Sequence, residues 1–407
     1  MTAYLLDVAS LLGRWLHLVA GIAWIGASFY FVWLDDSLRA PKRRELIDAG
    51  VGGEVWAVHG GGFYNAQKYR TAPAELPKPL HWFYWEAYTT WLSGFFLLCL
   101  LYLGKPDVYL VDAAVMPLGN GSAISIALAF LGGGWIAYDL LCRSPLARNE
   151  RALAAAIAAF VAATAWALCA LFSGRGAYIL FGALLGTIMA ANVFFVIIPG
   201  QREMVRAKSE GRVPDPIHGQ RGKQRSVHNT YFTLPVLFTM ISNHYALTYG
   251  ARDNALVLIA LAAAGALIRA WFVLRHKAHE RGGRTSPLPL AIGLATLGAV
   301  VALLAPARRH EVAAAAFSPE ANRMRFASIR SVVERRCVPC HSSTPTLAGF
   351  ATAPNGVLLD TPERLLAHTA QMQTQLSTGV MPNGNLTHMT DEERKLMLAW
   401  IADGTPH

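Results

Sequence analysis

Two cysteines and a histidine near the C-terminus have the spacing of a covalent cofactor site. Cys337 and Cys340 are two residues apart, and His341 follows directly. The C-x-x-C-H pattern attaches c-type haem, because the thiols can form thioethers while the imidazole binds iron. A local disulfide, a thioredoxin-like pair and half of a zinc site are the alternatives. No second C-x-x-C or H-x-x-x-H pattern completes a zinc site, so haem is favoured.

Met381 is the candidate for the second axial ligand of that iron. It follows His341 by forty residues, in a loop that reads Gly-Val-Met-Pro-Asn-Gly. A thioether in a loop of this kind suits the far side of a haem. Ordinary packing of Met381 is one alternative, and ligation by Met372 or Met389 is another.

The last hundred residues have the composition of a soluble domain. Helices are predicted near 324–336 and 361–376. A final helix is predicted to begin at Thr390, where a capping box to Glu393 can form. We therefore expect a small class I-like cytochrome c domain over residues 323–407.

The rest of the chain is too apolar for an ordinary soluble protein. Of 407 residues, 54% are hydrophobic and only 15% are charged. Runs long enough to cross a bilayer lie at 15–34, 84–103, 123–141, 152–172, 178–198, 229–248, 254–274 and 288–305. The predicted fold class is all-α, with an eight-helix transmembrane bundle in residues 1–306 and a tether in residues 307–322.

Lysine and arginine are unevenly shared between the loops that join these runs. The second, fourth and sixth loops hold only Lys105, Arg175 and Arg252, whereas the odd-numbered loops hold many more. The positive-inside rule places the odd-numbered loops in the cytoplasm, and both termini on the outer side, where c-type haem is attached. The net charge of +10 is then explained by the lipid bilayer, without a nucleic-acid partner.

Two histidines are predicted at the outer depth of the bundle. His17 shares a helical face with Gly13 and Gly21, and this face could admit a flat macrocycle or pack closely on another helix. His244 ends the sixth run. His228 begins that run sixteen residues earlier, about 24 Å away along a helix, so it belongs to the inner side.

A glycine-rich stretch in the first cytoplasmic loop combines several chemistries. Three glycines follow His59, and Phe63, Tyr64 and Lys68 come next. Glycines allow close approach of the backbone to a ligand, the rings offer stacking faces and the ammonium attracts an anion. A phosphate-binding loop is a weak alternative, because we expect no strand before it and there is no Gly-Lys-Ser/Thr ending.

Glu86 is a carboxylate just inside the second run, where charge is costly and therefore suggests function. Arg269, Asp139 and Asn192 fall in the same inner half, and His81 precedes Glu86 by five residues. These residues predict a polar cavity open to the cytoplasm. Direct pairing of Glu86 with Arg269 is the structural alternative.

Together these stretches resemble one known family. Residues 54–64, 81–88 and 242–245, with the C-x-x-C-H segment and Met381, are similar to the membrane-bound, cytochrome c-containing urate hydroxylase (urate oxidase) family of bacteria. The resemblance covers nearly the whole chain. It implies a multi-pass inner-membrane enzyme with a periplasmic cytochrome domain, which oxidises urate to 5-hydroxyisourate with water as the oxygen source. Electrons pass through one covalent haem c to a soluble cytochrome c or a terminal oxidase, so hydrogen peroxide is not formed.

Urate is a planar anion, so its site needs a base, a stacking surface and a positive charge. The candidate bases are His59, His81, Glu86 and His228. The candidate substrate-binding groups are Phe63, Tyr64, Lys68 and Arg269. The sequence does not decide among them.

A cytoplasmic urate site and an outer haem are separated by about 30 Å of hydrocarbon, so a relay is expected. One hypothesis is a b-type haem with His17 and His244 as iron ligands. In a competing arrangement urate itself binds near these histidines and there is no second haem. A function of a different class is also open: an electron-transfer subunit that relays electrons from a quinol or a dehydrogenase partner to a periplasmic cytochrome.

Overall fold

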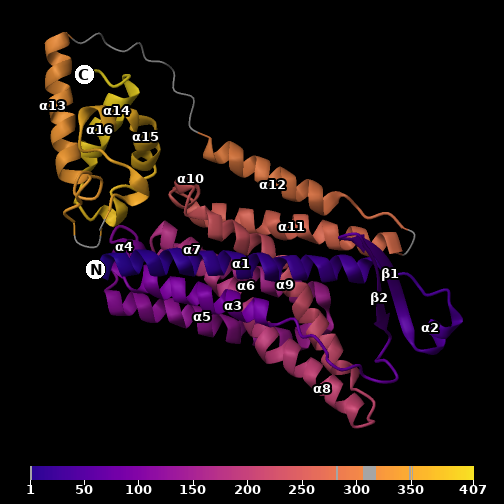
Figure 1. The fold of residues 1–407 in the computed structure, drawn as a ribbon. Coiled ribbons are helices and arrows are strands. Elements are labelled where there is room, and N and C mark those ends of the chain that lie inside the picture. The colour runs from indigo at the N-terminus through magenta and orange to yellow at the C-terminus, as the bar shows by residue number, and fades with distance from the viewer. Residues whose placement is uncertain (1, 281–282, 306–317, 348–349, 351) are drawn as a thin grey trace.

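The computed structural model describes residues 2–280, 283–305, 318–347, 350 and 352–407. Most of the expected tether lies outside these residues. A long helical unit is followed by a smaller C-terminal unit, residues 318–407 (Figure 1). The C-terminal unit lies near the beginning of the first helix, α1 (Thr2–Ser37), and a β-hairpin lies near its end.

Helices occupy all eight places at which a membrane span was predicted. They are α1, α3 (Trp85–Leu97) with its π-helical extension η1 (Leu98–Leu103), α5 (Asn120–Arg143), α6 (Glu150–Leu171), α7 (Gly174–Asn192), α9 (Pro216–Ser242), α11 (Asn254–Glu280) and α12 (Leu288–Leu304). Within the described ranges, six helices are long and apolar enough to cross a bilayer. The two predicted spans outside this set are α9, which begins with a polar half, and α12, which has 17 residues. The structure therefore supports six of the eight predicted spans.

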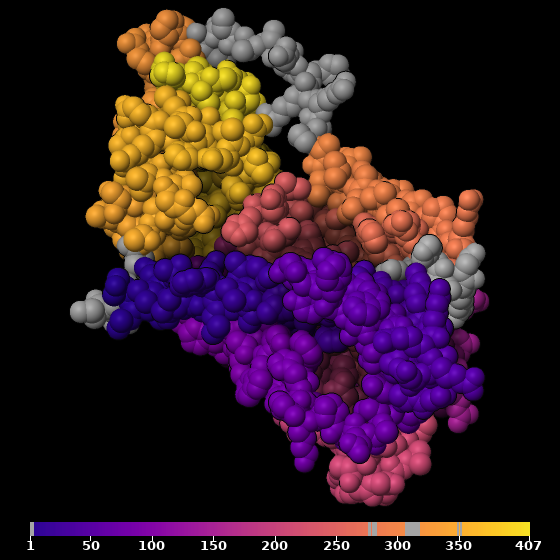
Figure 2. Space-filling view, turned by 45° about the vertical axis from the view of Figure 1, so that its right-hand side comes forward, coloured from indigo at the N-terminus to yellow at the C-terminus, as the bar shows by residue number. Residues whose placement is uncertain are grey.

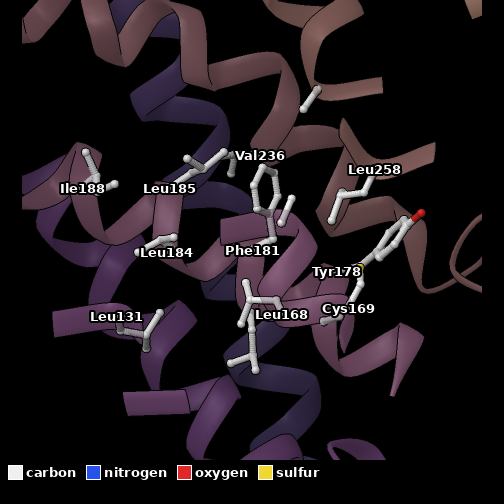
Figure 3. Close-up of a cluster of buried hydrophobic side chains, with 14 of the residues drawn as sticks. Leu131, Leu168, Cys169, Tyr178, Phe181, Leu184, Leu185, Ile188, Val236 and Leu258 are labelled. Carbon is white, nitrogen blue, oxygen red and sulfur yellow. The ribbon is translucent and has the colours of Figure 1, made fainter. Parts of the chain in front are cut away.

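The centre of the bundle is α7. Its side chains Phe181, Leu184 and Ile188 are completely buried in a cluster with residues of α5, α6, α9 and α11 (Figure 3). A glycine allows α9 to approach: a Cβ on Gly182 would lie 2.0 Å from Oγ1 of Thr239. Larger residues at this position would push the two helices apart.

The first long loop contains a short helix, α2 (Arg44–Asp48), and the β-hairpin, which the all-α prediction missed. Strands β1 (Val51–His59) and β2 (Gly62–Tyr69) pair antiparallel. Gly60 and Gly61 form the turn with φ of +56° and +81°, and a two-residue hairpin turn of this type requires two left-handed residues. The glycines therefore serve the backbone, and the expectation that no strand precedes them is wrong.

The C-terminal unit has its own hydrophobic core, which includes the fully buried Trp400. Its helices are α13 (Pro319–Arg336), α14 (Pro362–Ala367), α15 (Thr369–Ser377) and α16 (Asp391–Ala402). The single helix predicted at 361–376 is two helices, divided at His368. The capping box is confirmed, because Thr390 and Glu393 exchange side-chain and backbone hydrogen bonds at the start of α16.

Candidate functional site

Polar side chains from three helices form a hydrogen-bonded network inside the bundle. The network lies near the C-terminal end of α7, where the chain continues toward α8 (Ile198–Ser209). Its members, which we call the Tyr138 network, are Tyr138 and Asp139 of α5, Asn192 of α7, and Arg225, His228 and Asn229 of α9. All except the half-buried His228 are buried.

Two arginines hold the carboxylate of this network. Nη2 of Arg225 lies 2.7 Å from Oδ1 of Asp139, and Nε of Arg143 lies 2.6 Å from Oδ2. The Arg225 guanidinium also lies over the ring of Tyr138, 5.0 Å from its centroid. Two cations and one anion leave a net positive charge, which suits an anionic ligand.

His228 is paired with a phenol. Its Nδ1 lies 2.8 Å from the hydroxyl oxygen of Tyr138. Nδ2 of Asn192 donates to this same oxygen, at 3.1 Å, and to Oδ1 of Asn229, at 2.9 Å. In the tautomer whose Nδ1–H donates to Tyr138, Nε2 is the acceptor, so His228 can take up a proton from a substrate.

The backbone of α7 changes form at this point. Asn192 is its last residue, and a π-helical segment, η3 (Val193–Ile197), joins it to α8. π-helical turns inside longer helices often accompany functional sites. The π-helical segment thus begins directly after Asn192, a member of the Tyr138 network.

Sequence reasoning missed Tyr138, Arg225 and Asn229. Arg225 precedes the predicted sixth run (229–248) and therefore falls in an odd-numbered, basic loop by sequence, yet the structure buries it in α9. One signal was available: Arg225, His228 and Asn229 are spaced by three and four residues, so they share a helical face.

The predicted urate residues of the first loop lie on the hairpin and not in the Tyr138 network. His59, Phe63 and Tyr64 are exposed, Phe63 by 79%. Nζ of Lys68 forms an ion pair with Oδ1 of Asp35, at 2.7 Å. These four residues form a surface feature near the end of α1 (Figure 1).

The other predicted residues of the inner side are also dispersed. His81 is exposed and packs edge-on against Phe83, and Glu86 is half-buried in the first turn of α3, where the helix dipole favours a carboxylate. The Arg269 guanidinium lies 4.1 Å from the ring centroid of Phe29. Nε and Nη2 of Arg269 are buried without a hydrogen-bond partner among the described residues, so they do not pair with Glu86.

His17 packs directly against α3. Its Nδ1 lies 2.9 Å from the carbonyl oxygen of Thr90 and 3.1 Å from Oγ of Ser93. A Cβ on Gly94 of α3 would lie 2.7 Å from Cε1 of His17, and a Cβ on Gly13 would lie 3.0 Å from Cδ2 of Leu97, so a glycine on each helix allows close packing here. His244 is exposed in the turn after α9. Ligation of a b-type haem by these two histidines stays a prediction.

The residues predicted to hold haem c have the donor atoms that this group needs. The amides of Cys340 and His341 both donate to the carbonyl of Cys337, at 3.1 and 2.9 Å, so the three residues share one turn. Both cysteines are free thiols, and burial raises the pKa of Cys337 to about 12. His341 donates from Nδ1 to the carbonyl of Val357, at 3.0 Å, which orients the ring and leaves Nε2 as the nitrogen that could bind a metal.

Met381 differs from the other candidate methionines in its surroundings. Met372 and Met389 are buried in the core of the C-terminal unit, whereas Met381 is half-exposed and its carbonyl accepts a hydrogen bond from Nη1 of Arg394, at 2.6 Å. Its thioether is thus the one not used in that core. The described residues contain no cluster of three or more His, Cys, Asp or Glu side chains placed for a metal ion, and a His–Met haem needs none.

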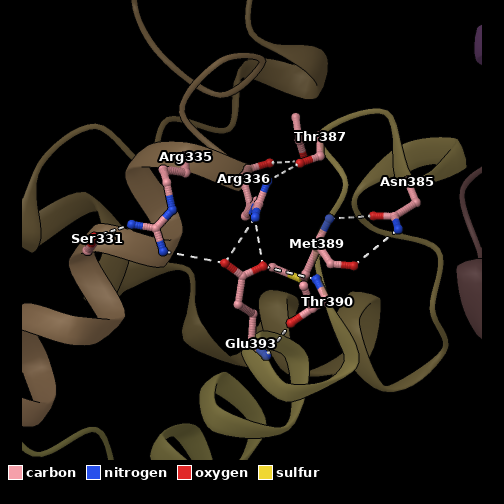
Figure 4. A network of polar contacts seen from close by, with 8 residues as sticks. All are labelled: Ser331, Arg335, Arg336, Asn385, Thr387, Met389, Thr390 and Glu393. Carbon is pink, nitrogen blue, oxygen red and sulfur yellow. Dashed lines mark hydrogen bonds and ion pairs between the residues drawn. The ribbon is translucent and has the colours of Figure 1, made fainter.

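A second network ties the end of α13, directly before the C-x-x-C-H turn, to the last helix (Figure 4). Oε2 of Glu393 accepts from Nε of Arg336, at 2.9 Å, and Thr387 donates to the Arg336 carbonyl, at 2.8 Å. Burial alone would raise the pKa of Glu393, but the hydrogen bonds from Arg336 and from the backbone of Thr390 outweigh it and lower that pKa.

The bundle combines six membrane-length apolar helices with a buried Arg225–Asp139 ion pair, to which the exposed Arg143 adds a second positive charge, and it is consistent with a membrane protein. Residues 3–305 match the family described as urate oxidase N-terminal. The chain therefore belongs to this family, and it is related to oxidoreductases that act on urate. The C-x-x-C-H segment lies beyond the matched residues. No curated protein and no solved structure matches the chain.

Proposed function

We propose that this protein is a cytochrome-linked urate hydroxylase. The observation that carries the proposal is the union, in one chain, of the urate oxidase N-terminal family in residues 3–305 with a C-x-x-C-H segment at 337–341. Urate and water give 5-hydroxyisourate, two protons and two electrons. Because the oxygen atom comes from water, dioxygen is not needed and hydrogen peroxide is not a product.

The Tyr138 network is the proposed site of the reaction. Arg225 and Arg143, with only one carboxylate between them, supply the positive charge that urate requires. His228 takes up a proton through Nε2, and Tyr138 stabilises the resulting imidazolium through Nδ1. Arg269, whose buried Nε and Nη2 have no hydrogen-bond partner among the described residues, is the alternative anion site.

Cys337, Cys340, His341 and Met381 are the proposed ligands and attachment points of one haem c. When bound there, the group supplies a one-electron acceptor, which is oxidised in turn by a soluble cytochrome c or a terminal oxidase. The chain's own part is to fix the imidazole through Val357 and the methionine loop through Arg394.

A b-type haem at His17 and His244 remains the proposed relay between the two ends. A pyridine haemochrome spectrum of the purified protein distinguishes b-type from c-type haem. A spectrum with c-type haem alone would contradict the relay. It would favour the arrangement in which His17 and His244 bind urate, and replacing His244 should then abolish urate binding.

Anaerobic titration of the purified protein with urate tests the whole proposal. We expect the c-type absorption band to become reduced, with one equivalent of urate supplying two electrons. If urate leaves the band oxidised while a quinol or a dehydrogenase reduces it, the protein is an electron-transfer subunit.

A further inference from the structure

Among the described residues, the C-terminal unit contacts α4 (Pro106–Tyr109) and α10 (Ala246–Tyr249) of the bundle through α15 and through the loop that follows it. Residues 378–384, which we call the docking segment, lie against α4 and α10. Nδ2 of Asn383 donates to the carbonyl oxygen of Val108, at 2.5 Å. Figures 1 and 2 show the C-terminal unit next to α10, at the end of the bundle away from the hairpin.

Apolar contact accompanies this hydrogen bond. Val380 packs against the core cluster of the bundle. A Cβ on Gly250, the residue after α10, would lie 2.4 Å from Cγ2 of Val380 and 2.9 Å from Cβ of Thr378. Gly250 has φ of −90°, so its conformation alone does not demand glycine. Part of the crowding comes from the carbonyl of Ala246, at 2.8 Å, and the rest comes from the C-terminal unit.

The docking segment also contains Met381, the proposed iron ligand. Nη1 of Arg394 donates to the carbonyls of Met381 and Leu376, at 2.6 and 3.1 Å, which ties the segment to α16. The loop that faces the bundle is therefore held rigidly by the unit that is to carry the haem. Residues on either side of Met381, Val380 and Asn383, make the contacts.

We infer that the docking segment seats the C-terminal unit on α4 and α10 with its Met381 side toward the bundle, and that this seated arrangement is the one that receives electrons. The second half of the inference rests on the proposed function. The first half concerns the chain alone. In the seated arrangement, the side of the C-terminal unit that faces away from α10 is left for an external electron acceptor.

A cysteine pair tests the seating directly. In Gly250→Cys with Thr378→Cys the two Cβ atoms lie close enough for a disulfide to form after small adjustments. We expect mass spectrometry of the oxidised, haem-loaded full chain to find the linked peptides. The matched control is Gly250→Cys with Thr374→Cys, because Thr374 is exposed one turn earlier on α15. The inference is overturned if the first pair fails to link, or if both pairs link equally.

Reduction of the linked protein tests the electron-receiving role. We expect anaerobic urate to reduce the haem of the linked Gly250→Cys, Thr378→Cys protein at a rate similar to that of wild type. If the wild type is reduced and the linked protein is not, the seated arrangement is not the receiving one. If urate fails to reduce the wild type, the proposed function fails, and the linkage still reports on the seating.

A charge substitution provides a second test, which does not require Gly250 to change. Val380→Glu buries an unpaired carboxylate against the bundle, so we expect reduction by urate to slow about tenfold or more. Thr374→Glu adds the same charge at an exposed site and should leave the rate unchanged. Haem content and reduction by ascorbate should be the same in both variants. Equal rates with urate in both variants would contradict the inference.

Discussion

Asp139 is held by two arginines that differ in exposure: the Arg225 side chain is 4% exposed and the Arg143 side chain 64%. We expect Arg225→Ala to lower the free energy of unfolding by about 3 kcal/mol, because it leaves buried polar groups uncompensated. Arg143→Ala should cost less than about 1 kcal/mol, since water replaces the contact. Denaturant unfolding in detergent micelles measures both, and equal losses would show that burial does not decide the contribution.

The sequence offers His228 and His59 equally as candidates for the base, and the two differ in their surroundings in the structure. His228 contacts Tyr138, whereas His59 is exposed beside the hairpin turn. We expect His228→Ala to slow urate-dependent haem reduction by about 10²- to 10⁴-fold, the usual range for a positioned base. His59→Ala should stay close to wild type, and reduction by ascorbate should be unaffected in both. The opposite order of effects would move the site to the hairpin.

Glu393 makes the C-terminal unit sensitive to acid. Because its folded pKa lies below the ordinary value of 4.5, its contribution to stability is complete above that value and is lost as the pH falls through the folded pKa. The protection of α16 amides against hydrogen exchange, expressed relative to their intrinsic exchange rate at each pH, should therefore decrease once the pH drops below 4.5. Glu393→Gln should raise exchange at neutral pH and weaken this acid response. An unchanged acid response would assign it to other carboxylates.

At the scale of elements, the hairpin carries the clearest lesson about what sequence can tell. The signal was present: three glycines, two of which form the turn, lie between Val58 and Phe63, and aromatic and β-branched residues of this kind are typical of strands. The glycines were read as a ligand loop because ligand loops and hairpin turns both need positive φ. A helix, in contrast, lies at each predicted span, and six of the eight are long and apolar enough to cross a bilayer, since long apolar runs have few other solutions.

The turn itself gives an element-scale prediction. Gly61 has φ of +81°, so we expect Gly61→Ala to destabilise the hairpin by about 1–2 kcal/mol. Gly26 lies within α1 with open space around it, and Gly26→Ala should be neutral or stabilising by roughly 0.5–1 kcal/mol. Hydrogen exchange of peptides from residues 51–69 measures the first change, and thermal unfolding measures the second. Faster exchange in both variants would point to a general loss of stability.

For the whole molecule, the orientation in the membrane is predicted from the distribution of lysine and arginine between the loops. Gly211 is flanked by basic residues at the end of α8 (Arg206 and Lys208) and at the start of α9 (Arg221 and Lys223), whereas the C-terminal unit lies at the other end of the bundle (Figure 1). We expect alkaline phosphatase fused after His407 to be active outside the cytoplasm, and a fluorescent protein inserted at Gly211 to fluoresce inside. An inactive phosphatase after His407, or the absence of fluorescence at Gly211, would contradict the predicted orientation.

The limits of sequence reasoning were greatest where distant helices meet. Asp139, Asn192 and His228 were all assigned to the inner half, and the structure joins them through Arg225 and Tyr138. Spacing along one helix could not reveal this, because the partners come from α5, α7 and α9. The buried face of each helix is set by packing at positions such as Gly182, which only the folded bundle defines.

The length of α7 has an energetic consequence under the proposed function. It begins at Gly174, against the carbonyl of Tyr249 in α10, and ends at Asn192 in the Tyr138 network. The difference of 18 residues (192 − 174) corresponds to about 27 Å. Electrons would leave urate on the inner side and arrive on the outer side, so each turnover would carry negative charge outward. A membrane potential that is negative inside would assist this movement by about 2.3 kcal/mol per electron for each 100 mV.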